Sequence, residues 1–330
     1  MFFHPSVFLF FFMLFFSIVM MICMNSWFLI WFFIEMNLLS FIPLIMLKKS
    51  KFSVESSLKY FFIQTLSSIF ILIGVLMMFM NIEMFNYLFV GGLSIKLGLA
   101  PFHQWVVNIV EGLMWPLVGI LFTVQKIGPF ILLNYMYMMS ESIIYIIYSI
   151  SILCSVVGCL GGLFTSSLRK IMVFSSISHS SWMVLGLIMS IFMWMIYFMF
   201  YSLIFFSVLL YLNKFGLMSL NHMFLKLQYF SSLSLSVGVM SMGGLPPLSG
   251  FIPKFIFMKE FILFYNFFLL LFLLLGVFIS LFFYSRVFVL NLIYFSSKNL
   301  FLMNKETAGS FTMYVNMLGF FLIPFMFYFY

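Results

Sequence analysis

The sequence predicts an all-α polytopic membrane protein of about eleven transmembrane helices, and three observations support this fold class. First, 65% of the 330 residues are hydrophobic and only 7% are charged, whereas soluble domains carry about 25% charged residues. Second, apolar stretches of about 20 residues, the length that crosses a bilayer as a helix, recur along the whole chain. Third, the chain lacks the short segments of alternating hydrophobicity that are typical of a transmembrane barrel.

The basic residues between the apolar stretches predict the number and the direction of the helices. With eleven spans, ten basic residues fall on the side of the N-terminus, and Lys259 is the one on the opposite side. Because basic loops stay on the inner side of a membrane, we expect the N-terminus inside and the C-terminus outside. The net charge of +8 then reflects topology and gives no support to nucleic-acid binding. The spans are predicted at residues 3–23, 25–47, 57–80, 84–108, 115–137, 143–163, 168–189, 192–213, 229–262, 265–291 and 312–330.

Two of these spans, the fourth and the ninth, contain residues that interrupt a helix. Proline removes a backbone donor and clashes with the preceding turn, and the backbone groups that it frees must face protein or water inside the membrane. The fourth span should therefore break between Gly91-Gly92 and Pro101, and the ninth at Gly243, Gly244, Pro246 and Pro247.

The two interrupted spans occupy matching positions in the chain. Each is the fourth member of a set of five spans, residues 1–137 and 143–291, within a single membrane domain of residues 1–330. Because five is odd, the second set enters the membrane from the opposite face, and we expect two inverted five-helix repeats followed by a loop and an eleventh helix at residues 298–330. Paired interruptions in inverted repeats indicate a site at the membrane midplane.

Four charged side chains lie deep inside the apolar spans: Glu35, Lys96, Lys126 and Lys254. A charge at the centre of a membrane helix costs about 2.5–3.5 kcal/mol even on insertion scales. Burial disfavours the charged form of a lysine, and a nearby carboxylate, for which Glu35 is the candidate, favours it. We therefore predict a path for protons along the midplane through these four residues. The alternative is that the charges only fix helix packing.

Two further residues are weaker candidates for a relay. His179 fits a proton relay and an interhelical hydrogen bond equally well, and Arg286 lies near the basic end of its span, where it could relay protons or extend to the membrane surface. The sequence has no glycine-rich nucleotide loop, metal-ligand cluster or paired histidines for haem. No catalytic, cofactor-binding or metal-binding residue is therefore predicted on this chain.

Several motifs combine these charged residues with the helix-breaking ones. They are Glu35-Met-Asn-Leu-Leu-Ser-Phe-Ile-Pro43, Lys96-Leu-Gly-Leu-Ala-Pro-Phe-His103, Gln125-Lys126-Ile-Gly-Pro129, the stretch from Leu168 to His179, and Gly243-Gly-Leu-Pro-Pro-Leu-Ser-Gly-Phe-Ile-Pro-Lys254. In combination they resemble the subunit 2 family of mitochondrial NADH dehydrogenase (respiratory complex I), a family of antiporter-like membrane subunits. The likeness covers residues 25 to about 290, and the 30 Met and 52 Phe fit the codon bias of an AT-rich organellar genome.

The resemblance implies an antiporter-like fold and a proton-translocating membrane-arm subunit of NADH:ubiquinone oxidoreductase. It assigns Glu35 and Lys96 to the first half-channel, Lys126 to the connection and Lys254 to the second half-channel. It places FMN, iron–sulfur clusters and ubiquinone in partner subunits and none of them on this chain. The implied partners are other membrane-arm subunits and membrane lipids. The implied location is the mitochondrial inner membrane, with the N-terminus in the matrix and the C-terminus towards the intermembrane space.

Two other functions remain open at this point. A freestanding or Mrp-type cation/proton antiporter subunit would share the fold and the lysines, but the isolated chain would then transport cations. A structural membrane subunit without a proton path of its own would need the lysines for assembly and never for pumping alone.

Overall fold

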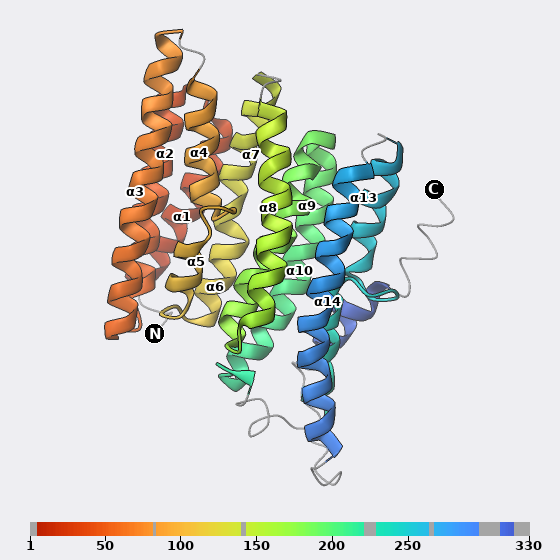
Figure 1. Cartoon of the computed structure of the whole chain (residues 1–330). Helices are drawn as coiled ribbons and strands as arrows, with labels where there is room; N and C mark the ends of the chain where they lie inside the picture. Colours follow the sequence, from red (N-terminus) through yellow and green to blue (C-terminus); the bar gives the residue numbers. More distant parts are fainter. Residues whose placement is uncertain are drawn as a thin grey trace. The chain divides into compact units, whose positions relative to one another are not determined.

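The computed structural model describes residues 5–81, 84–139, 143–220, 229–263, 267–296 and 311–319. Within these ranges the chain consists of α-helices joined by turns and short loops, with one isolated bridge between Ser167 and Ser219. The all-α fold class is therefore confirmed (Figure 1). Most of the predicted C-terminal loop and of the eleventh span lies outside the described residues.

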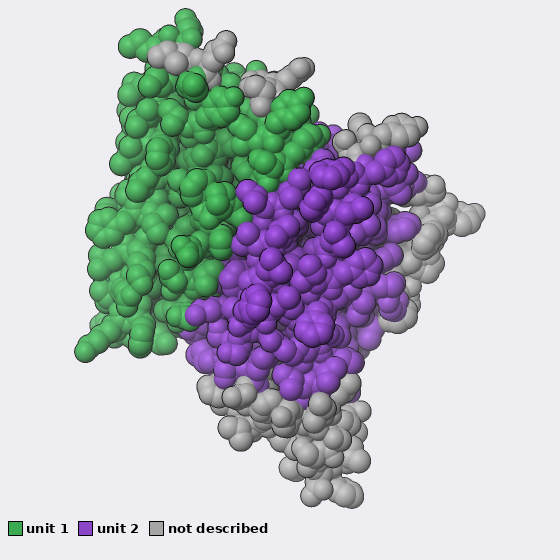
Figure 2. All heavy atoms as spheres, in the orientation of Figure 1, with its two compact units in different colours: residues 1–150 green, residues 151–330 purple. Residues whose placement is uncertain are grey.

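The chain divides into two compact units, residues 1–150 and 151–330, which Figure 2 shows in green and purple. The predicted repeats, 1–137 and 143–291, stay a prediction. Unit 1 contains α1 (Pro5–Cys23), α2 (Trp27–Met46), α3 (Lys51–Phe79), α4 (Phe85–Leu97), α5 (Gln104–Val110), α6 (Trp115–Phe122) and α7 (Val124–Met139). Helix α8 (Ile143–Phe164) begins in unit 1 and continues into unit 2. Unit 2 also contains α9 (Leu168–Met189), α10 (Ile191–Phe215), α12 (Tyr229–Gly243), α13 (Phe251–Leu263) and α14 (Phe267–Ser296).

In both units the helix surfaces are apolar and many buried positions are polar. Phe8 is 74% exposed on α1 and Phe278 is 68% exposed on α14, as expected where lipid is the solvent. Ser175, Ser176 and Ser180 on α9 are buried, and each hydroxyl donates to the carbonyl three residues earlier. Such bonds within the helix satisfy the donor of a buried serine hydroxyl, so α9 can be almost wholly buried.

Eight stretches of the described chain are long and apolar enough to cross a membrane. One of them joins α6 and α7 over 115–139, and the other seven are α1, α2, α3, α8, α9, α10 and α14. The pairs α4–α5 and α12–α13 occupy the fourth and ninth predicted spans. Helices α4 and α5 have 13 and 7 residues, and α12 and α13 have 15 and 13. Eight spans and two interrupted pairs make ten, and the eleventh predicted span is helical over 311–319, where it is described.

The interruptions differ from the prediction in detail. Helix α4 runs through Gly91-Gly92 without a break and ends at Leu97. Gly92 is needed there because α3 packs so closely that an added Cβ would lie 2.8 Å from Ile71. A third break, at Thr123, separates α6 from α7 and was not predicted. Its backbone angles are φ −117° and ψ −78°.

Helix α3 also begins earlier than expected, at Lys51 instead of residue 57. Ser50 caps it: the Ser50 hydroxyl accepts from the Ser53 N–H, and the Ser53 hydroxyl accepts from the Ser50 N–H. Reciprocal caps of this kind satisfy two backbone donors at a helix N-terminus. The polar residues that looked like a loop are therefore the first turns of the helix.

Candidate functional site

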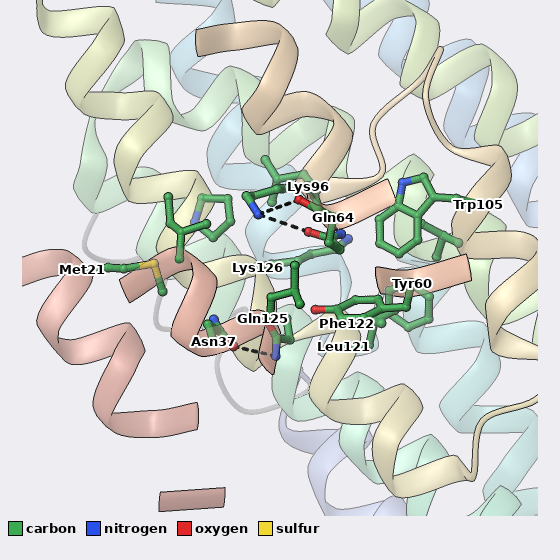
Figure 3. Close-up of a pocket in the computed structure, with 15 residues that line it drawn as sticks. Met21, Asn37, Tyr60, Gln64, Lys96, Trp105, Leu121, Phe122, Gln125 and Lys126 are labelled. Atoms are coloured by element: carbon green, nitrogen blue, oxygen red, sulfur yellow. Dashed lines mark hydrogen bonds between the residues drawn. The ribbon is translucent and has the colours of Figure 1, made fainter. Parts of the chain in front are cut away.

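All seven helices of unit 1 contribute side chains to one cavity (Figure 3). About 40 Å³ of this cavity is open to the centres of water-sized molecules. One water needs roughly 10–15 Å³ by this measure, so there is room for about three. Its polar lining comprises Asn37, Tyr60, Gln64, Lys96, Gln125 and Lys126.

The first interruption places Lys96 at this cavity, in the last turn of α4. Gly98 adopts φ +66° and donates its N–H to the Ile95 carbonyl, while Leu99 donates to the Ser94 carbonyl. This pair of bonds is a Schellman motif, the usual end of a helix at a glycine. Trp105, at the start of α5, also donates its indole N–H to the Ile95 carbonyl at 3.0 Å. Because α4 ends here, the Lys96 amine reaches the cavity. The helix dipole favours a positive charge in the last turn of a helix.

Gln64 on α3 is the hydrogen-bond partner of Lys96. The Lys96 Nζ lies 3.4 Å from both the backbone carbonyl and the Oε1 of Gln64, and the Gln64 Nε2 donates to the Lys96 carbonyl at 3.5 Å. These long bonds hold the amine loosely. Figure 3 shows the two side chains meeting at one side of the cavity.

Lys126 reaches the same cavity from α7, three residues after the break at Thr123. Its side chain is 5% exposed, and its Nζ lies 5.4 Å from the ring centroid of Phe122. Pro129, one turn further, has no N–H to donate to the Gln125 carbonyl, and it lines the cavity too. The structure therefore brings two of the predicted path residues, Lys96 and Lys126, to one cavity.

A hydrogen bond between two side-chain amides also lies at this cavity. Gln125 on α7 donates from Nε2 to the Oδ1 of Asn37 on α2 at 2.9 Å. Figure 3 shows this pair near Lys126, with the Tyr60 hydroxyl pointing into the same space. The bond orients the residue next to Lys126 and ties α7 to α2.

Glu35 lies on α2, partly buried, and does not line the cavity. Among the ion pairs of the described residues, none joins the Glu35 carboxylate to Lys96. In the described part of the chain, the ion pair found joins Lys59 and Glu55 on the exposed face of α3. Lys96 therefore has Gln64 as its contact and Glu35 as a more distant charge.

The second interruption places Lys254 in a tighter site. Its Nζ donates to the carbonyl of Gly243, the last residue of α12, at 2.7 Å, and the side chain is 5% exposed. Gly244 adopts φ +79°, and an added Cβ would lie 2.9 Å from the Lys254 Nζ. The break at Gly243-Gly244 thus supplies both the acceptor for the amine and the space beside it.

Lys254 lines a small cavity with room for about one water, of about 10 Å³. His179 on α9 lines this cavity and also a second one of about 10 Å³. Its Nδ1 lies 2.9 Å from the hydroxyl of Tyr197 on α10. His179 therefore separates two water-sized cavities, one shared with Lys254 and one shared with Tyr197.

Arg286 has the contacts of a helix cap. Its guanidinium donates to the carbonyls of Leu163 at 3.1 Å and Thr165 at 2.5 Å, at the C-terminal end of α8. Both the charge and the hydrogen bonds suit a helix C-terminus. Arg286 lines none of the three cavities described above, and its role as a relay stays a prediction.

Sequence reasoning did not single out Gln64 or the bond between Asn37 and Gln125. A lone amide inside an apolar span is a usable signal, since such groups are costly in lipid without a partner. Within the described residues, no group of three or more His, Cys, Asp or Glu side chains is placed to hold a metal ion.

The transmembrane family described as NADH:quinone oxidoreductase/Mrp antiporter matches residues 24–86 and 79–282. The NADH-ubiquinone oxidoreductase chain 2 of Anopheles gambiae is 41% identical over 256 residues, covering 74% of this chain and 73% of the relative. The protein of the same name from Artemia franciscana is 37% identical over 243 residues, covering 74% and 76%.

Solved structures share the fold at low sequence identity. A chain of respiratory complex I from Thermus thermophilus with bound aureothin superposes with a TM-score of 0.75 at 20% identity, over 93% of this chain and 75% of that chain. A chain of the Mrp complex from Dietzia sp. superposes with a TM-score of 0.71 at 16% identity, over 88% of this chain and 59% of that chain. The antiporter-like fold expected from the sequence is therefore confirmed. The chain belongs to the NADH:quinone oxidoreductase/Mrp antiporter transmembrane family, among the chain 2 subunits of NADH-ubiquinone oxidoreductase.

Proposed function

We propose that this chain carries protons within the membrane arm of NADH:ubiquinone oxidoreductase, along a path that includes Glu35, Lys96, Lys126 and Lys254. One observation carries the proposal: Lys96 and Lys126, from two different helices, line one cavity with room for about three waters. Lysines that only fixed helix packing would need no shared space for water.

The arrangement in unit 1 suits proton transfer for an electrostatic reason. Two charged ammonium groups at one small cavity repel each other strongly where the dielectric constant is low. A proton that arrives on Lys126 therefore favours release of a proton from Lys96, and waters in the cavity can carry it between them. An ionised Glu35 would oppose that release, because a nearby negative charge favours the charged form of a lysine. A change in the distance between Glu35 and Lys96 would thus control the direction of transfer.

In unit 2, Lys254 is the corresponding proton carrier and His179 is a relay between two water-sized cavities. The Gly243 carbonyl accepts one of the three N–H groups of a charged Lys254 amine, which leaves the other two to donate to water in the cavity. We assign Arg286 to the capping of α8.

The energy for this movement would come from other subunits. The relatives are named for the oxidation of NADH by ubiquinone, and we place FMN, the iron–sulfur clusters and ubiquinone in partner subunits. Other membrane-arm subunits and lipids would cover the exposed apolar faces of this chain. The excess of basic residues on one side supports an orientation with the N-terminus in the matrix and the C-terminus towards the intermembrane space of the mitochondrial inner membrane.

The test is the Lys126→Met variant in the assembled complex, reconstituted in liposomes. We expect the number of protons pumped per NADH oxidised to fall while the amount of assembled complex stays normal. Lys59→Met is the matched control, because Lys59 is exposed on α3 and pairs with Glu55. A normal pumping ratio in an assembled Lys126→Met complex would rule out the proposal.

The same experiment separates the two other functions. Cation-dependent proton movement by the isolated chain in liposomes would indicate a freestanding or Mrp-type antiporter. Lysine variants that prevent assembly, and never lower the pumping ratio of the complex that does assemble, would indicate a structural subunit.

A further inference from the structure

One residue outside the predicted path, Asn316, contacts both edges of the second interruption. Its backbone carbonyl accepts the N–H of Ser249, just before α13, at 3.0 Å. Its side-chain Oδ1 accepts a hydrogen bond from the hydroxyl of Ser241, in the last turn of α12. Asn316 lies in the helical segment 311–319 and is 0% exposed. The segment 311–319 therefore bridges the break between α12 and α13.

The amide nitrogen of Asn316 is also bonded. It donates to the Ser207 hydroxyl on α10 at 3.4 Å and to the Thr312 carbonyl at 2.6 Å. A buried amide whose donors and acceptor all have partners holds a single orientation, because any rotation leaves polar groups unpaired. Asn316 thus fixes the segment 311–319 to α10 as well as to the break.

The backbone of the segment lies directly against the loop between α12 and α13. A Cβ added at Gly319 would lie 2.4–2.5 Å from backbone atoms of Leu248, Pro247 and Ser249. Contact this close requires glycine, so the segment and the loop cannot separate without losing packing as well as hydrogen bonds.

These contacts reach Lys254 through the end of α12. The Ser241 carbonyl accepts the Gly244 N–H at 3.0 Å, and Gly250 packs against the same carbonyl, with an added Cβ only 1.7 Å away. The carbonyl of Gly243, two residues after Ser241, accepts a hydrogen bond from the Lys254 amine. Any shift of Ser241 would therefore move the acceptor of Lys254.

We propose that Asn316 is a positioning residue, which holds both edges of the interrupted helix and thereby keeps the Lys254 amine at its water-sized cavity. The inference rests on the proposed role of Lys254 in proton transfer. The segment 311–319 would then serve to hold the interruption between α12 and α13 in place.

The test uses the assembled complex with Asn316→Ala, Ser241→Ala and the double variant. Asn316→Ala removes the side-chain bonds to Ser241 and Ser207 and keeps the backbone bond to Ser249. We expect it to slow proton transfer through this unit by about two- to twelvefold, the factor that corresponds to one ordinary hydrogen bond, and thereby to lower the protons pumped per NADH. Because the two side chains act as one unit, the double variant should be no worse than the more severe single variant. Tyr314→Ala is the control, since Tyr314 lies in the same segment and is 75% exposed.

Combination with Lys254→Met distinguishes this inference from the proposed function. If Asn316 acts through Lys254, Asn316→Ala should cause no further loss of pumping in the Lys254→Met complex. A normal ratio for Lys254→Met itself would refute the role of Lys254. A lowered ratio for Lys254→Met with normal ratios for Asn316→Ala and Ser241→Ala would refute the role of Asn316 alone. If Asn316→Ala fails to assemble, Ser241→Ala decides, and a normal ratio in that variant overturns the inference.

Discussion

The two interrupted helices place a lysine in very different surroundings. Lys96, at the first break, is partly buried, has hydrogen bonds of 3.4 Å, and lines a cavity with room for about three waters. Lys254, at the second break, is 5% exposed, has a bond of 2.7 Å to a backbone carbonyl, and lines a cavity for about one water. The same device, a broken helix, thus yields a loosely held amine in unit 1 and a tightly held amine in unit 2. Under the proposed function, this difference predicts that unit 1 exchanges protons readily and that unit 2 controls their release.

The largest expected effect comes from removing each amine. Among the described residues, Lys254 is the only lysine that lines its cavity, whereas Lys126 remains at the other cavity when Lys96 is replaced. We expect Lys254→Met to slow proton transfer through its unit by at least about a hundredfold, the usual effect of losing a proton-transfer group. Lys96→Met should slow proton transfer clearly less than Lys254→Met does.

The measurement is proton pumping per NADH in complexes matched for assembled protein. Lys214→Met is a control in unit 2, because Lys214 is exposed at the end of α10. Equal losses for Lys96→Met and Lys254→Met would show that the second lysine at the larger cavity gives no compensation.

Replacing the glycine at each break sharpens the comparison. In Gly98→Ala the added Cβ would lie 2.3 Å from the buried Val106 at φ +66°. We expect a loss of about 2–5 kcal/mol of stability, from strain and overpacking, seen as reduced assembly. In Gly244→Ala the backbone is also strained, at φ +79°, but the added Cβ meets the Lys254 side chain, which can move. We therefore expect a smaller loss of stability, about 1–2 kcal/mol from the backbone strain, and a fall in pumping by the complex that assembles.

Gly91→Ala is the control for both glycine variants. No heavy atom outside its own helix neighbourhood lies within 4 Å of an added Cβ there, and alanine favours a helix by about 0.5–1 kcal/mol over glycine. A Gly98→Ala complex that assembles normally would contradict the description of the first break.

Weakening or strengthening the contact between Lys96 and Gln64 should have a moderate effect on the rate of pumping. Gln64→Leu removes the side-chain acceptor of Lys96 and leaves the backbone carbonyl of residue 64 in place. The lost bond has a net value of about 0.5–1.5 kcal/mol, so the rate of pumping should change by several-fold. Gln64→Glu should slow pumping more, because a carboxylate in contact with Lys96 holds its proton. Identical pumping by wild type, Gln64→Leu and Gln64→Glu would show that this contact has no role.

The smallest effect on pumping is expected at Arg286. Arg286→Met removes two charge-assisted bonds to the end of α8, each worth about 1.5–3 kcal/mol. Thermal stability of the complex should fall, and the protons pumped per NADH should stay normal. A lowered ratio at normal assembly would instead support the relay role suggested by the sequence.

The sequence predicted those features that depend on local chemistry. Spans of apolar residues, the breaks near Pro101 and Pro246-Pro247, and the buried lysines follow from hydrophobicity and from the geometry of glycine and proline. The break at Thr123 was missed because no glycine or proline marks it. Gly91-Gly92 was read as part of a break, although Gly92 serves the close packing of α4 on α3.

The partners of the buried polar groups could not be predicted. Gln64 and Asn316 are single amides in apolar segments, and their partners lie 32 and 75 residues away along the chain. Which side chain an amide meets depends on how the helices pack, and helix packing admits several angles and registers for one sequence. The shared cavity of Lys96 and Lys126 is a property of that packing.

Ordered water in the assembled complex tests the central claim most directly. In a density map that resolves water, we expect about three molecules between Lys96 and Lys126 and about one in each cavity beside His179. Cavities filled by apolar side chains or lipid, with each amine sealed in a dry pocket, would contradict a path for protons through this chain.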